Sequence, residues 1–281
     1  MRILVTGANG YIGQGVVKAL LDKGCYVIAT DFQDDYIDRR ALIKKCNLFS
    51  QEEPFEYFEK PDALLHLAWR DGFQHNSLAH MTDLSQHYLF VKKMMDGGLK
   101  HFCGMGSMHE VGAYEGSIDE NTPTNPLSLY GISKNALREA CQLLAKEKGA
   151  LFQWIRGYYI VGNSERGCSI FSKIELAEKQ GQEYFPFTTG SNQYDFIDYD
   201  VFCNQVAAVA MQKEITGIIN CCSGQPMKLA ERVEKFIKDH DFQIKLQYGV
   251  FKDRPYDSKA VWGNNDKIQR IIKGCNDEHI S

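Results

Sequence analysis

The sequence lacks the features that would direct a chain of 281 residues to nucleic acid or to a membrane. Its 32 Lys and Arg residues are outnumbered by 36 Asp and Glu residues, which gives a net charge of −4 and a pI near 6.1. There is no polybasic block and no tail of one charge sign, so the composition argues against an electrostatic nucleic-acid binder. No apolar run approaches the length of about 20 residues that a transmembrane helix needs.

The cysteines lack the spacing of a metal site or of a disulfide framework. None of the nine cysteines belongs to a C-x-x-C pair, and the adjacent Cys221 and Cys222 are not at a metal-binding spacing. An odd, dispersed set of this kind is typical of reduced thiols. The first predicted strand begins at Arg2, which leaves no room for a signal peptide. We therefore expect a cytoplasmic protein without a metal centre.

A glycine-rich segment follows the first apolar run directly. The sequence from Thr6 to Gly13 reads TGANGYIG, between a predicted strand over 2–6 and a predicted helix over 14–23. Gly7 allows a tight turn, Gly10 a close approach to a pyrophosphate, and Gly13 close packing of helix on strand. The helix N-terminus offers free N–H groups to the phosphates. The motif predicts these dinucleotide contacts: Gly7, Asn9, Gly10, Tyr11, Ile12 and Gly13.

Asp31 ends the second predicted strand, over 25–30. An acid at this position hydrogen-bonds a ribose 2′-OH and repels the additional phosphate of NADP. The sequence thus favours NAD, while Arg39 and Arg40 nearby leave NADP open as the alternative.

A Tyr and a Lys lie four residues apart in the segment Tyr130-Gly131-Ile132-Ser133-Lys134. Asn125-Pro126 is a helix-start signal, so we predict a helix over 127–148 that carries both side chains on one face. An ammonium near a phenol favours the phenolate and lowers the tyrosine pKa toward the operating pH of a proton-transfer group. Upstream, Ser107 follows a predicted strand over 100–105, at a strand end where α/β sheets bind ligands.

Strands and helices alternate to about residue 160, which predicts an α/β fold with a Rossmann-type, doubly wound parallel sheet. Strands are expected over 62–67 and 152–156, and a long helix over 76–95. Beyond residue 163 the pattern becomes irregular. We assign 1–162 to the dinucleotide-binding domain, with 193–222 returning to it. We assign 163–192 and 223–281 to a smaller C-terminal substrate-binding lobe.

Together these motifs resemble the extended short-chain dehydrogenase/reductase family, in its branch of nucleotide-sugar epimerases, dehydratases and reductases. The resemblance covers nearly the whole chain. TGANGYIG, the segment 62–68, the strand end at Ser107, YGISK and the segment 195–201 occur in the order of that family.

The resemblance implies roles for particular residues. Tyr130 would be the acid/base, and Lys134 would bind the nicotinamide ribose and depress the tyrosine pKa. Ser107 would orient the substrate oxygen, Leu67 and Ala68 would line the cofactor channel, and Arg254 would hold the substrate diphosphate. The predicted helix over 76–95 corresponds to one that often forms dimers, so a homodimer is expected.

Departures from the family pattern narrow the chemistry. Related 4,6-dehydratases carry an Asp-Glu pair directly after the catalytic hydroxyl, where this chain has Met108 and His109. Dehydration is therefore not expected. Tyr159 stands where the family often has an Asn that contacts the sugar. His109 matches the position of a second acid/base in some relatives, and a purely hydrogen-bonding role is the alternative.

These observations predict an NAD(P)H-dependent reductase of a nucleotide-linked 4-keto-6-deoxy sugar, with Tyr130 as the proton donor. A nucleotide-sugar epimerase that retains NAD is the alternative. A third hypothesis is a non-catalytic dinucleotide sensor, although such proteins tend to lose the Tyr-Lys pair.

Overall fold

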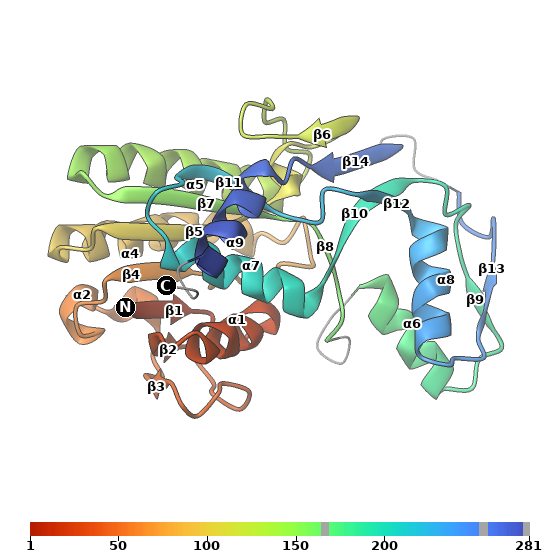
Figure 1. Cartoon of the computed structure of the whole chain (residues 1–281), viewed down its shortest axis with the longest axis horizontal. Helices are drawn as coiled ribbons and strands as arrows, with labels where there is room; N and C mark the ends of the chain where they lie inside the picture. Colours follow the sequence, from red (N-terminus) through yellow and green to blue (C-terminus); the bar gives the residue numbers. More distant parts are fainter. Residues whose placement is uncertain (164–168, 253–257, 278–281) are drawn as a thin grey trace.

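The computed structural model describes residues 1–163, 169–252 and 258–277. A large layered α/β unit carries the N-terminus and the last described helix of the chain, and a smaller lobe extends from it (Figure 1). Within the described ranges, no helix is long and apolar enough to cross a membrane.

The centre of the large unit is a seven-stranded sheet in the order β11-β7-β5-β4-β1-β2-β3, with every neighbouring pair parallel. From β1 the chain adds β2 and β3 on one side of the sheet, and then β4, β5, β7 and β11 on the other side. The strand order therefore reverses between β1 and β4. Ligands bind at the carboxyl ends of the strands at such a reversal. The strands are β1 (Arg2–Thr6), β2 (Tyr26–Thr30), β3 (Leu42–Ile43), β4 (Ala63–His66), β5 (His101–Ser107), β7 (Leu151–Gly157) and β11 (Gly217–Cys221).

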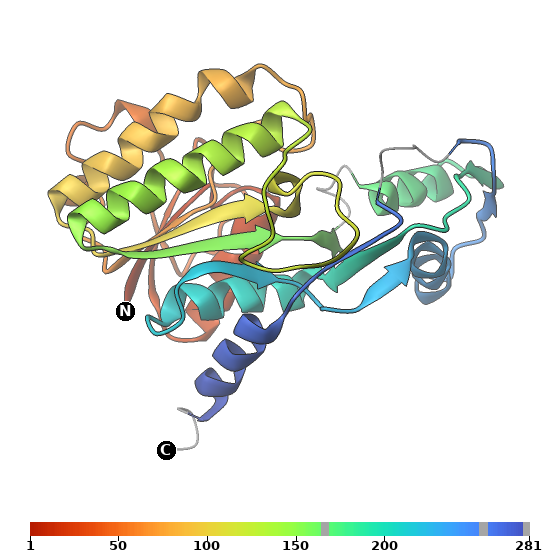
Figure 2. The same cartoon turned by 90° about the horizontal axis from the view of Figure 1, so that it is seen from above.

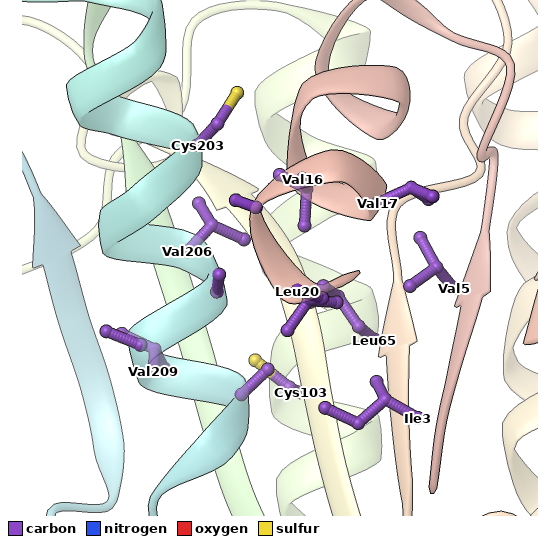
Figure 3. Close-up of a cluster of buried hydrophobic side chains, with 14 of the residues drawn as sticks. Ile3, Val5, Val16, Val17, Leu20, Leu65, Cys103, Cys203, Val206 and Val209 are labelled. Carbon is purple, nitrogen blue, oxygen red and sulfur yellow. The ribbon is translucent and has the colours of Figure 1, made fainter. Parts of the chain in front are cut away.

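Helices cover both faces of this sheet because the strands alternate buried side chains between the two faces. Ile3 and Val5 pack with Val16 and Val206 under α1 (Tyr11–Asp22) and α7 (Tyr199–Met211), as Figure 3 shows. Leu4 points the other way, into the cluster beneath α4 (Leu84–Gly97) and α5 (Leu129–Lys148). Those two long helices lie side by side on one face of the sheet (Figure 2).

The smaller lobe has its own strands. A second sheet runs β12-β10-β14-β6 with β8 paired to β10, and β9 pairs with β13. Its helices α6 and α8 enclose a separate apolar cluster that contains Phe171, Ile174 and Phe236. The bounds are β6 (Gly116–Ile118), β8 (Tyr159–Val161), α6 (Ile170–Lys179), β9 (Tyr184–Pro186), β10 (Gln193–Asp198), β12 (Pro226–Lys228), α8 (Leu229–Asp239), β13 (Lys245–Gln247) and β14 (Ala260–Gly263).

Two predicted helices differ from those observed. The helix expected over 76–95 is divided into α3 (Ala79–Thr82) and α4, with Asp83 between them. The helix expected to start at Asn125-Pro126 begins at Leu129, because Ser128 is the N-cap and its side chain accepts a hydrogen bond from the Gly131 N–H. The remaining short elements are η1 (Leu48–Ser50), α2 (Pro54–Tyr57) and η2 (Met108–Glu110).

The assignment of chain segments to the two lobes stays a prediction, and some elements pack differently from it. Helix α9 (Asp266–Asp277), in the segment assigned to the smaller lobe, packs against α7 and β11. Its Ile268 and Ile271 belong to the same apolar cluster as β1. Strand β10, in the segment assigned to the larger domain, pairs in the second sheet.

Candidate active site

A cavity of about 1790 Å³ lies at the carboxyl ends of the central strands and extends to the smaller lobe. One end is formed by the glycine-rich loop after β1, the middle by the segments after β4 and β5, and the far end by β8, β10 and α6. Among the described residues, no group of three or more His, Cys, Asp or Glu side chains is placed to hold a metal ion.

The glycine-rich loop is closed so tightly that side chains would not fit. Gly7 has φ of +68°, and a Cβ on it would lie 2.7 Å from the backbone of Ala68. A Cβ on Gly13 would lie 2.1 Å from the Gly7 carbonyl oxygen. Gly10 is the N-cap of α1 and no side chain caps this helix. The first N–H groups of α1 therefore face the cavity free of side-chain acceptors, as an anion-binding site requires.

Asp31 sits at the end of β2 on the wall of the same cavity. Its carboxylate accepts hydrogen bonds from the Asn9 N–H at 3.0 Å and from the Phe32 N–H at 2.7 Å. The two nearby arginines are directed elsewhere, since Arg39 pairs with Asp34 and Arg40 pairs with acids that include Asp38.

The wall beyond Asp31 was missed by the sequence reasoning. The segment 46–49, which contains the first two residues of η1, lines the cavity there. It carries no glycine motif and no periodicity, so only its packing beside β2 reveals it. On the opposite wall, the predicted Leu67 and Ala68 do line the cavity, and the Ala68 N–H donates to the Thr6 hydroxyl at 3.2 Å.

Ser107, Tyr130 and Lys134 meet at the middle of the cavity although they come from β5 and α5. The Ser107 hydroxyl interacts with the Tyr130 phenol and favours its ionised form. The Lys134 Nζ is buried and donates to the Met105 carbonyl at 2.7 Å. The predicted hydroxyl, phenol and ammonium groups are thus neighbours, as proton transfer to a bound oxygen requires.

The electrostatics of this group differ from the expectation that Lys134 depresses the tyrosine pKa. Burial and the nearby Glu110 raise the pKa of Tyr130 to about 12, against the smaller effect of the Ser107 hydroxyl. Burial lowers the pKa of Lys134 to about 7, with Glu110 acting in the opposite direction. Desolvation disfavours the charged form of both groups, so the phenol is protonated at neutral pH.

His109 lies beside this group. Its ring centroid is 6.0 Å from that of Tyr130 and 4.4 Å from that of His75. Burial, with a smaller effect of His75, lowers the pKa of His109 to about 4. The imidazole is therefore neutral at pH 7, when it accepts a proton more readily than it donates one.

Glu110 was not predicted, although the sequence contained a signal for it. Ser107 and Glu110 form a capping box around η2, in which the Ser107 N–H donates to Glu110 Oε1 at 2.8 Å. The same oxygen accepts from Trp154 Nε1 at 2.9 Å, and Oε2 lies 3.3 Å from Arg156 Nε. A Ser-x-x-Glu spacing after a strand is the pattern that indicates such a box.

Two residues further along the segment after β4, Trp69 and His75, were also missed. The Tyr130 N–H donates to the His75 carbonyl at 2.9 Å. The His75 ring stacks on the phenol ring, with centroids 5.4 Å apart and planes 12° from parallel. The Trp69 ring lies against Lys134. No local pattern indicates these contacts, because they join residues more than 50 positions apart.

Tyr159 lines the far end of the cavity, where its ring packs against Tyr194 with centroids 4.6 Å apart. Phe171 and Phe196 line the same end. Arg254, predicted to hold the substrate diphosphate, lies outside the described residues.

Comparison with known proteins identifies a matching family model and a similar relative. The model of the NAD dependent epimerase/dehydratase family matches residues 3–222. A dTDP-6-deoxy-L-talose 4-dehydrogenase (NAD(+)) of Aggregatibacter actinomycetemcomitans is 44% identical over 271 residues, which cover 94% of this chain and 99% of that protein.

Solved structures share the fold at lower identity. The UDP-glucuronic acid 4-epimerase of Bacillus cereus, in complex with UDP-glucuronic acid and NAD, superposes with a TM-score of 0.80 at 19% identity, over 97% of this chain and 93% of that one. The UDP-glucose 4-epimerase of Thermotoga maritima, with UDP-glucose, gives 0.82 at 20% identity, over 96% and 92%.

Proposed function

The chain belongs to the NAD dependent epimerase/dehydratase family, and from this premise we propose that it interconverts the 4-keto and 4-hydroxyl forms of a dTDP-linked 6-deoxyhexose. The observation that carries the proposal is the 44% identity, over 99% of its length, to a relative named as a 4-dehydrogenase of dTDP-6-deoxy-L-talose. Reduction of the ketone is the reverse of that dehydrogenation. The reductase predicted from the sequence and the activity named for the relative therefore describe one equilibrium.

The site fits a dinucleotide. A Cβ at Gly7 or Gly13 would collide with neighbouring backbone, so these glycines keep the loop in its tight turn before α1, and the start of α1 has no side-chain cap. When bound there, NAD(H) supplies or accepts the hydride. Asp31 would receive the ribose hydroxyls, which favours NAD over NADP because Arg39 and Arg40 are paired with acids.

The protonation state of Tyr130 in the free protein suits reduction of the ketone, because reduction needs a proton donor. Since the pKa of Tyr130 is raised to about 12, the phenol carries its proton at neutral pH. It would donate this proton to the oxygen that becomes the 4-hydroxyl, while Ser107 shares the hydrogen bond. Lys134 would bind the nicotinamide ribose. His109, neutral at pH 7, would orient a sugar hydroxyl as an acceptor, and Tyr159 would contact the sugar nucleotide.

The test follows absorbance at 340 nm with purified protein. We expect NADH oxidation with a dTDP-4-keto-6-deoxyhexose, slower oxidation of NADPH, and NAD reduction with dTDP-6-deoxy-L-talose. Tyr130→Phe should lower kcat by about 10²–10⁴-fold, the range for loss of a general acid. The matched control is Tyr26→Phe, which removes an exposed phenol on β2. A flat trace with every sugar, together with NAD retained through purification, would favour the epimerase alternative.

Two further properties belong to the proposal. Helices α4 and α5, side by side in Figure 2, expose Leu89, Ile132 and Leu143. An exposed apolar face on paired helices is suited to a homodimer, which sedimentation of the wild type and Leu143→Glu would test. The seven cysteines whose side chains the structure describes are all free, in keeping with a reducing cytoplasm.

A further inference from the structure

The ammonium of Lys134 is held by two groups of the protein itself. Its Nζ donates to the Met105 carbonyl at 2.7 Å and lies 3.8 Å from the ring centroid of Trp69. A cation this close to an indole face is attracted by the quadrupole of the ring, and the attraction grows when water is excluded. The Lys134 side chain is only 3% exposed, so this condition is met.

Trp69 is itself fixed by two histidines. Its Nε1–H donates to His80 Nδ1 at 3.0 Å. Because Nδ1 is the acceptor, the His80 proton resides on Nε2, which donates to the Gln74 carbonyl at 3.0 Å. On the other side, the His87 ring stacks on the indole with centroids 4.6 Å apart and planes 17° from parallel. The indole plane therefore has one orientation, with a face toward Lys134.

We propose that Trp69 is a positioning residue that keeps the amine of Lys134 charged and directed at the cofactor site. This inference rests on the proposed role of Lys134 toward the nicotinamide ribose. Nothing in the local sequence around Trp69 indicates the contact, because Trp69 follows β4 and Lys134 lies on α5.

The charges around Lys134 show why an additional stabilising group matters. Burial lowers the pKa of Lys134 to about 7, and Glu110, from η2, opposes this effect. Tyr130, on the same helix, is protonated at neutral pH. His66 from β4 and His87 from α4 are neutral, since burial lowers their pKa values to about 3 and about 2. Glu110 is thus the one described charge that favours the ammonium at this site.

Glu110 is also shared with two arginines. Its Oε2 lies 3.3 Å from Arg156 Nε and 3.8 Å from Arg138 Nε. Its carboxylate is therefore already engaged with buried guanidinium groups. The indole face, by contrast, has no competing cation among the described contacts, so Trp69 complements Glu110 in favouring the charged amine.

The experiment measures the dissociation constant of NADH by calorimetry from pH 5.5 to 8.5, without sugar. The affinity should fall as Lys134 loses its proton, and Lys134→Met should abolish this pH dependence. Trp69→Phe and Trp69→Leu have similar volumes, but only Phe keeps an aromatic face. The midpoint is the pH at which half of the affinity change has occurred. We expect this midpoint to lie about one pH unit lower in Trp69→Leu than in the wild type. In Trp69→Phe it should stay close to the wild-type value.

Trp262→Leu is the control for loss of an indole away from the cavity, and should leave the midpoint unchanged. Superimposed curves for Trp69→Phe and Trp69→Leu would overturn the proposal, since packing alone would then explain the residue. So would a wild-type affinity that does not change with pH. Because no sugar is present, these outcomes are independent of whether the protein reduces a dTDP-linked ketone.

Discussion

Replacement of Glu110 by Gln tests how the buried charges next to Ser107, Tyr130 and Lys134 stabilise the protein. Glu110 and Arg156 are both fully buried, and Oε2 of the carboxylate lies 3.3 Å from the guanidinium. In Glu110→Gln, the amide oxygen can still accept from the Ser107 N–H and from Trp154 Nε1. The amide NH₂ would then face the N–H groups of Arg156, so that two donors oppose each other and the buried cation loses its partner.

Removal of one partner from a buried ion pair costs about 3–5 kcal/mol, because the remaining charge is left uncompensated. For a chain of this size, each kcal/mol lowers Tm by about 2–4 °C. We therefore expect Glu110→Gln to lower Tm by about 10 °C, measured by differential scanning calorimetry. Because Glu110 raises the pKa of both Tyr130 and Lys134, the variant should also move the pH–rate profile toward lower pH.

The control is Glu139→Gln, which changes an exposed acid that pairs with Arg138 at 3.0 Å. It should cost less than about 1 kcal/mol, since exposed ion pairs contribute little. Arg156→Met in the Glu110→Gln background removes the unpaired cation and should recover part of the loss. A Tm for Glu110→Gln within about 2 °C of the wild type would refute this account of the buried charges.

Three further outcomes are expected. Asp31→Asn removes the charge that repels a 2′-phosphate. The ratio of kcat/KM for NADPH to that for NADH should therefore rise by about tenfold, or ~1.4 kcal/mol. An unchanged ratio would mean that residues other than Asp31 distinguish NADH from NADPH. Gly13→Ala brings a Cβ to within 2.1 Å of the Gly7 carbonyl oxygen, so NADH binding should weaken by more than about tenfold in calorimetry, and normal binding would contradict the close contact. Burial lowers the pKa values of His66 and His87 to about 3 and about 2, below the unfolded value near 6.5. Below pH 6.5 the unfolded state then binds protons that the native state does not. Urea unfolding should therefore show a free energy of unfolding that is constant above pH 6.5 and falls below it by about 1.4 kcal/mol per pH unit for each residue. Equal free energies of unfolding at pH 7.5 and 5.5 would disprove this prediction.

The amino-acid sequence alone was sufficient for the central architecture, because the signals there are local. A strand that ends in TGANGYIG and an amphipathic helix after it predict the β1–α1 unit, and the structure confirms a parallel sheet at that position. The spacing of Tyr130 and Lys134 placed both side chains on one face of α5 through helix periodicity. These predictions needed only the residues within one or two turns of the chain.

The wrong predictions concern helix boundaries, at places where a local sequence pattern competes with a contact to another segment. Asn125-Pro126 has the chemistry of a helix start, yet Ser128 is the N-cap. The Asn125 N–H instead donates to the Val111 carbonyl, a contact with the segment after β5. The apolar pattern over 76–95 continued through a break at Asp83, whose side chain pairs with Arg70. In both cases a contact distant in sequence accompanies the change of boundary.

Sequence alone thus determined that the chain has a glycine-closed nucleotide loop, a Tyr-Lys pair on one helix and a hydroxyl at a strand end. Only the tertiary structure decided their electrostatics. It buried Tyr130 and Lys134 so that desolvation is the largest influence on both pKa values, placed Glu110 near enough to raise both, and brought the Trp69 ring centroid to 3.8 Å from the Lys134 Nζ. Such effects depend on solvent exclusion and on distances between remote segments, and these exist only once the chain has folded.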